Sequence, residues 1–75
     1  PMTTIRFGLP KAGRVKLEIF DITGRKINVG LAPAVEYPAG YHEVTINGRY
    51  LASGIYFCRM TVGNFTANRK LLLLK

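Results

Sequence analysis

Residues 51–75 read LASGIYFCRMTVGNFTANRKLLLLK. This stretch gives the clearest indication of the fold class, because it holds two strand-forming runs joined by a short loop. Aromatic and branched side chains dominate the run that ends at Val62 and the run that begins at Phe65. Gly63 and Asn64 separate the two runs, and a two-residue loop with glycine first is typical of a type II′ turn in a β-hairpin. The sequence therefore predicts a hairpin that closes an all-β domain.

Four consecutive leucines, residues 71–74, lie near the end of this hairpin. Side chains alternate along a strand, so Leu71 and Leu73 are predicted to share one face and Leu72 and Leu74 the other. A two-layer fold buries only one of these pairs well, and we expect the other pair to meet a partner, either a receptor strand or a second copy of the chain. The structural alternative is a strand that its own fold covers on both faces. Three basic residues bracket the run and would keep an exposed strand soluble: Arg69, Lys70 and Lys75.

Upstream of the hairpin, short alternating segments are separated by glycine and proline. The clearest is 14–20, where Val15, Leu17 and Ile19 are predicted to face inward. Further strands are predicted at four places: 4–9, 26–29, briefly near Val35, and 41–47. With the hairpin this gives six or seven strands without helical periodicity, which indicates a β-sandwich, with a five-stranded barrel as the alternative.

The composition limits the possible classes of protein. A chain of 75 residues with 48 % hydrophobic content forms one small domain. Cys58 is the single cysteine, so the chain has no internal disulfide. A formal charge of +7 favours contact with polyanions, and no segment approaches the roughly 18 apolar residues of a membrane span. The chain begins with Pro1 and not with methionine, and we therefore expect it to be a piece of a longer polypeptide.

Catalysis is not expected, because the chain offers few titratable groups that can converge. Glu18 and Glu43 alternate with inward apolar residues and should point to solvent as parts of a solvated sheet face. Cys58 and His42 fall on predicted core faces, where an inert buried thiol beside a packed imidazole is the simpler interpretation. No spacing indicates a metal site. We expect no catalytic residue, no metal and no cofactor.

Two binding functions compete with docking of the last strand on a receptor. Nucleic-acid binding would use a basic sheet face with Tyr41 and Phe57 as stacking platforms. The cations available for it are dispersed over several predicted strands: Arg6, Arg14, Lys16, Arg59 and Arg69. We therefore expect no nucleic-acid partner. A non-catalytic accessory module that binds carbohydrate or another polyanion is the other alternative, although the chain has no tryptophan for a sugar platform.

Six short motifs follow one another along nearly the whole chain. They are TTIRF at 3–7, GRV at 13–15, FDITGR at 20–25, PAGYH at 38–42, LASGIY at 51–56 and KLLLLK at 70–75. In this order they resemble the C-terminal sorting domain of type IX (Por) secretion substrates. The immunoglobulin-like domain of flagellar hook-capping proteins shares the Asp-x-x-Gly-Arg and Gly-x-Tyr elements.

The resemblance implies an immunoglobulin-like antiparallel β-sandwich of about seven strands, with residues 1–75 as a single C-terminal sorting domain cut from a larger exported protein. Such a domain directs an upstream cargo across the outer membrane of bacteria of the Bacteroidetes group. The implied partners are the outer-membrane type IX translocon and a sortase-like peptidase that removes the domain. The implied route passes through the periplasm to the cell surface or the extracellular space.

The resemblance also implies which residues the translocon recognises. They are the positions that match the family's recurring ones: Gly40, Gly54, Tyr56, Arg59, Lys70, Leu71, Leu72, Leu73, Leu74 and Lys75. Of these, the group from Lys70 onward is predicted to carry most of the recognition.

Overall fold

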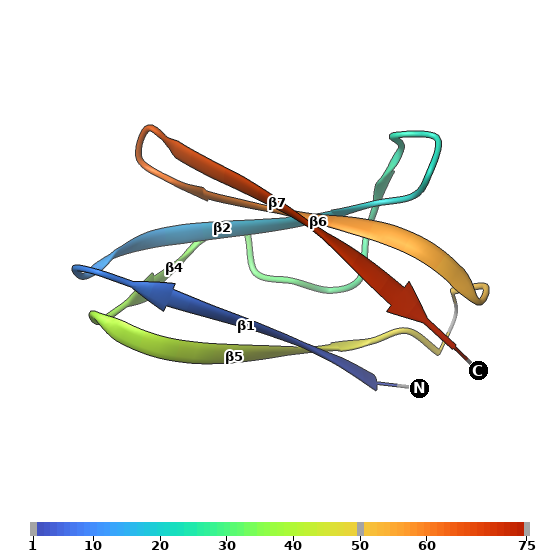
Figure 1. The fold of residues 1–75 in the computed structure, drawn as a ribbon, viewed down its shortest axis with the longest axis horizontal. Coiled ribbons are helices and arrows are strands. Elements are labelled where there is room, and N and C mark those ends of the chain that lie inside the picture. The colour runs from blue at the N-terminus through green and yellow to red at the C-terminus, as the bar shows by residue number, and fades with distance from the viewer. Residues whose placement is uncertain (1, 50, 75) are drawn as a thin grey trace.

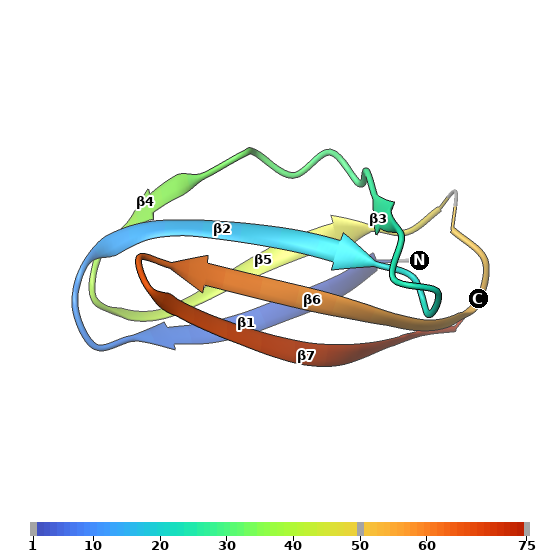
Figure 2. The ribbon, with the colours of Figure 1, turned by 90° about the horizontal axis from the view of Figure 1, so that it is seen from above.

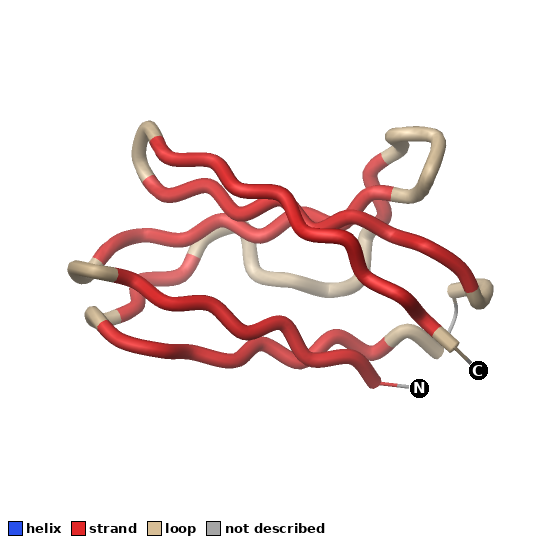
Figure 3. The backbone as a smooth tube through the Cα atoms, viewed as in Figure 1, coloured by secondary structure: helices blue, strands red, loops and turns tan. Residues whose placement is uncertain are grey.

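A computed structural model describes residues 2–49 and 51–74, and these residues form seven strands and no helix (Figures 1 and 3). The strands are β1 (Met2–Leu9), β2 (Gly13–Phe20), β3 (Lys26–Ile27), β4 (Val35–Tyr37), β5 (Gly40–Asn47), β6 (Gly54–Val62) and β7 (Phe65–Leu73). The described residues contain no helix long and apolar enough to cross a membrane.

The strands form two antiparallel sheets that pack as a sandwich, and this confirms the predicted fold class. β1 and β5 form the smaller sheet, in which Met2 pairs with Asn47 and Leu9 pairs with Gly40. The larger sheet has the order β3-β2-β6-β7, and β4 also pairs with β2, on the side away from β6 on which β3 lies (Figure 2). Figure 2 shows the larger sheet from above, with β1 and β5 beneath it.

The core lies between the sheets, where the alternating apolar side chains of both sheets meet. Four buried residues form its centre: Ile5, Ile19, Ile46 and Cys58. Val15 and Ile19 are buried and Leu17 packs against the centre, so the predicted inward face of β2 is confirmed. Burial of aliphatic side chains supplies most of the driving force for a domain of this size.

The β6–β7 hairpin has the predicted connection. Gly63 has φ +57°, whereas no residue other than glycine has a positive φ in the described chain. A type II′ turn needs a positive φ only at its first central residue, and a type I′ turn needs it at both, so a negative φ at Asn64 agrees with type II′. The turn sets the register in which Val62 pairs with Phe65 and Gly54 pairs with Leu73.

Strand β3 is shorter than predicted, since the segment 26–29 forms a strand only over Lys26–Ile27. The amide of Gly30 donates to Oδ1 of Asn28 at 3.0 Å, and Gly30 has φ +78°. A side chain that bonds the backbone two residues ahead makes a turn, and this turn ends the strand.

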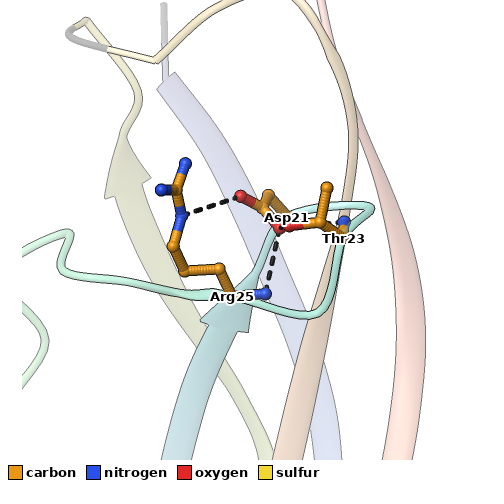
Figure 4. A network of polar contacts seen from close by, with 3 residues as sticks. All are labelled: Asp21, Thr23 and Arg25. Atoms are coloured by element: carbon orange, nitrogen blue, oxygen red, sulfur yellow. Dashed lines mark hydrogen bonds and ion pairs between the residues drawn. The ribbon is translucent and has the colours of Figure 1, made fainter.

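Asp21 organises the turn between β2 and β3 (Figure 4). Its Oδ1 accepts from the amide of Thr23 at 2.9 Å, from the hydroxyl of Thr23 at 2.6 Å and from the amide of Arg25 at 3.0 Å. The guanidinium of Arg25 lies 3.4 Å from its Oδ2. The amide of Gly24 donates to the carbonyl of Asp21 at 3.0 Å, which closes the predicted turn.

These contacts should make the stability of the turn depend on pH. The hydroxyl of Thr23, with smaller contributions from the amides of Arg25 and Thr23 and the charge of Arg25, lowers the pKa of Asp21 below its ordinary value of 3.8. A carboxyl with a lowered pKa in the folded state contributes stability above its unfolded pKa and loses it as the pH falls through the folded pKa. We therefore expect the stability difference between the wild type and Asp21→Asn to shrink below about pH 4. Urea unfolding between pH 2 and pH 7 measures this, and a difference that does not change with pH would contradict it.

Candidate recognition face

The leucine run divides between the two faces of β7 as its alternation predicts. Leu73 is 5 % exposed and lies against Gly48, where an added Cβ would come within 2.9 Å of the Leu73 side chain. Leu71 is partly buried and packs against the core. Leu72 is 62 % exposed and Leu74, just past the end of β7, is 70 % exposed. One pair of leucines is therefore structural and the other pair is available for contact.

The outward side of Leu72 belongs to a larger exposed apolar cluster. Leu72 pairs with Ile55, and Lys70 pairs with Phe57 on the same side of the sheet. Phe57 in turn pairs with Phe20 of β2. Ile55 and Phe57 are exposed although both are large and hydrophobic. Large apolar side chains that are contiguous and exposed mark interaction surfaces in many proteins.

We call this surface the outer face, and define it by its residues on β2, β6 and β7. Its members are Lys16, Glu18, Phe20, Ile55, Phe57, Arg59, Lys70 and Leu72. Three of these residues, Ile55, Phe57 and Phe20, are not among those that the resemblance implied for recognition. Apolar residues at both even and odd positions of 55–58 are the signal that could have found the first two, because they place apolar side chains on both faces of one strand.

A carboxylate covered by three cations occupies the centre of the outer face. Glu18 lies 3.4 Å from Nζ of Lys26, 3.7 Å from Nζ of Lys16 and 4.0 Å from a guanidinium nitrogen of Arg59. Glu18 lies on the outward side of β2, as predicted, but its side chain is only 13 % exposed. The long side chains of its sheet neighbours cover it, because the register of β2, β3 and β6 brings them together.

Arg59 serves two contacts on this face. Besides its ion pair with Glu18, its guanidinium lies over the ring of Phe20, 4.6 Å from the centroid. A cation over an aromatic face is attracted by the ring quadrupole. Arg59 is therefore held in place on the outer face next to the apolar cluster.

The other recognition residues implied by the sequence are not on this face. Tyr56 points inward, and its hydroxyl donates to the carbonyl of Ala52 at 2.6 Å. Gly54 begins β6 opposite Leu73. Gly40 begins β5 with φ +119°, a backbone conformation that favours glycine, and the start of β5 lies at the opposite end of the sandwich from the end of β7 (Figures 1 and 2). Lys75 lies outside the described residues.

The side chains weighed for other chemistry do not converge. Glu43 pairs with Arg6 at 3.0 Å in the smaller sheet, whereas Glu18 is in the larger sheet. His42 packs with Phe7 and Tyr37, and its Nε2 bonds the carbonyl of Pro38 at 2.7 Å. No cluster of three potential metal ligands occurs within residues 2–49 and 51–74.

Cys58 lies in the buried centre of the core, as predicted. Burial raises the pKa of its thiol, and the nearby charge of Arg69 opposes this shift. A thiol that is harder to ionise is less nucleophilic, which fits a packing role.

The basic residues considered for nucleic-acid binding are divided among three surfaces. Lys16 and Arg59 lie on the outer face with Phe57. Arg6 lies on the smaller sheet, next to Glu43, and Tyr41 belongs to the same sheet. Arg69 stands opposite Cys58, on the inward side of β7.

The family model of the secretion system C-terminal sorting domain, the Por secretion tail, matches residues 2–74. The chain belongs to this family. The sorting domain therefore directs a cargo protein to the type IX secretion system, which exports it across the outer membrane to the cell surface or beyond. It is the tail of that cargo protein and interacts with the secretion machinery. Comparisons with curated proteins and with solved structures gave no match. The family match lends no support to the accessory-module alternative, and a sorting domain of this type is not known to be catalytic.

Proposed function

We propose that the type IX machinery recognises this sorting domain mainly through the outer face, with Leu72 and its neighbours as the contact. The observation that carries the proposal is the exposure of Leu72, Ile55 and Phe57 on one side of the sheet, beside Lys70. Interfaces are often centred on buried apolar anchors surrounded by polar residues. Leu74 would extend the same contact beyond the end of β7.

The inward residues of the predicted set have a different role in this proposal. Tyr56, Leu71 and Leu73 hold β6 and β7 against the core, and Gly54 shapes the start of β6. They would support recognition by keeping the outer face in place. Lys75 would also contact the machinery, because it follows the exposed leucines in the sequence.

The proposal also covers the fate of the domain. Residues 1–75 would form a single sorting domain of a larger exported protein, whose cargo precedes β1. A sortase-like peptidase would remove the domain at the outer membrane once the cargo has crossed. The domain itself would act by recognition alone and would need no cofactor.

A reporter fused ahead of residues 1–75 and expressed in a host with a type IX system tests the recognition face. We expect Leu72→Ser to lower surface display at least tenfold, because it removes an apolar anchor from the contact. The fold should be preserved, since Leu72 is largely exposed.

Tyr41→Ser is the matched control, because Tyr41 is 93 % exposed but lies on the smaller sheet. We expect its display to stay within twofold of the wild type. Thermal unfolding of both purified variants checks that each remains folded. Equal display of Leu72→Ser and the wild type would show that the address lies elsewhere.

A further inference from the structure

Strand β7 forms one edge of the larger sheet. Among the described residues it pairs with β6 along its whole length and with no other strand. Along the edge of β7 that faces away from β6, its nine residues therefore leave a row of backbone donors and acceptors without a strand partner. An edge of this length is a template for a further strand.

Two adjacent cations lie in the middle of this edge strand. Arg69 stands opposite Cys58, on the inward side, and Lys70 stands opposite Phe57, on the outer face. Consecutive residues of a strand project to opposite sides, so the two charges flank the free edge from both sides.

The chain has no side-chain carboxylate to spare for these cations. Its four carboxylates are engaged elsewhere, as the ion pairs of the described residues show: Glu43 with Arg6, Glu36 with Arg14, Asp21 with Arg25, and Glu18 with Lys16, Lys26 and Arg59. No described carboxylate forms an ion pair with Arg69 or Lys70. The edge thus combines unpaired backbone groups with two uncompensated positive charges.

A second copy of the domain is a poor partner for this edge. A two-fold antiparallel pair centred on the middle of β7 would set Arg69 directly against Arg69 of the other copy, with each Lys70 next to this pair and opposite Asn68. Like charges directly opposite one another destabilise a sheet, and a formal charge of +7 on each copy adds long-range repulsion. A lipid surface would satisfy the charges but not the row of backbone groups.

We propose that an acidic extended segment of the secretion machinery adds to the free edge of β7 as a further strand. Two consecutive acidic residues of that segment would face Arg69 and Lys70, one on each side of the sheet. An apolar residue two positions away from the acidic residue facing Lys70 would cover Leu72 on the outer face. This inference rests on the proposed function, because it gives the chemistry of the partner that reads the same surface.

A synthetic nonapeptide tests the inference on the 75-residue chain. The probe is Thr-Val-Val-Asp-Asp-Thr-Val-Thr-Thr with blocked ends, which in antiparallel register places its two aspartates opposite Lys70 and Arg69 and a valine opposite Leu72. The matched probe has two lysines in place of the aspartates. We expect the acidic peptide to bind and the basic one to bind at least tenfold more weakly, because opposite charges across strands attract and like charges repel.

Amide hydrogen exchange supplies the readout for strand addition. In the free domain, the β7 amides that do not bond to β6 should exchange rapidly, and the acidic peptide should protect them. Lys70→Glu should weaken binding of the acidic peptide about tenfold. Lys11→Glu is the matched control, with the same change of charge in the exposed turn between β1 and β2, and should change binding less than twofold.

Three outcomes would overturn the inference. The first is binding that shifts the NMR resonances of residues on the outer face without protecting the β7 amides from exchange. The peptide would then contact the outer face without pairing with β7 as a strand. The second is equal affinity for the acidic and basic peptides. The third is a dimer in sedimentation whose β7 amides are protected without any peptide. None of these outcomes bears on the display of Leu72→Ser, which tests the proposed function separately.

Discussion

Replacing Leu73 with alanine should destabilise the domain by about 3 kcal/mol, whereas Leu72→Ala should change the free energy of unfolding by less than about 0.5 kcal/mol. The two leucines are neighbours and chemically identical, but Leu73 is buried against Gly48 and Leu72 is mostly exposed. Deleting a buried leucine side chain loses its transfer free energy and leaves a cavity. An exposed leucine has neither effect.

Urea unfolding followed by circular dichroism measures this contrast. Small domains hold on the order of 0.05 to 0.15 kcal/mol per residue, so Leu73→Ala should remove a large part of the total stability. The slope of the unfolding transition should stay the same for both variants, which checks that the surface exposed on unfolding is unchanged. Similar losses for both leucines would mean that the division of the run between the two faces is wrong.

Tyr56→Ala should cost about 3 kcal/mol, and Tyr56→Phe should cost about 1 kcal/mol. The ring packs against the core, and its hydroxyl donates to Ala52 at 2.6 Å, which ties the loop before β6 to the strand. The alanine variant loses both contacts, while the phenylalanine variant loses only the hydrogen bond. The difference between the two variants therefore isolates the packing of the ring.

Thermal unfolding of both Tyr56 variants measures these costs, and Tyr41→Phe provides a control at an exposed tyrosine. The same variants also separate a structural role from a recognition role. If Tyr56→Phe kept its stability but lost surface display, Tyr56 would contact the machinery directly, contrary to its inward position.

Local alternation predicted much of this fold. Val15, Leu17 and Ile19 were assigned to the core from their spacing, and glycine at position 63 predicted the type of the hairpin turn. These features depend on residues a few positions apart. The geometry of a single strand or turn determines them, and a sequence states it directly.

The pairing of strands could not be predicted in the same way. β3 and β4 both pair with one edge of β2 (Figure 2), and the chain between them contains one proline, Pro33, and no sustained period. Alternation identifies the face on which a side chain lies but does not identify the neighbouring strand. The covering of Glu18 by three cations depends on such neighbours, and for this reason it became visible only in the structure.

The residues that the resemblance implied for recognition divide between the two sides of the larger sheet. The sequence implied Arg59, Lys70 and Leu72, which share the outer face, together with Tyr56 and Leu73, which point inward. Motifs shared by a family mix residues that maintain the fold with residues that make contacts. Only the exposure of each side chain in three dimensions separates the two groups.

The start of β1 and the end of β7 lie at the same end of the sandwich (Figures 1 and 2). The cargo precedes β1, so a machine that grips the end of β7 would apply tension between two adjacent strand ends. Under such tension the residue pairs between β6 and β7 would break one at a time, starting with Gly54 and Leu73. Strand β7 would then separate from β6 progressively from that end. A pull on the end of β7 would therefore meet the sandwich in a direction in which few residue pairs resist at a time.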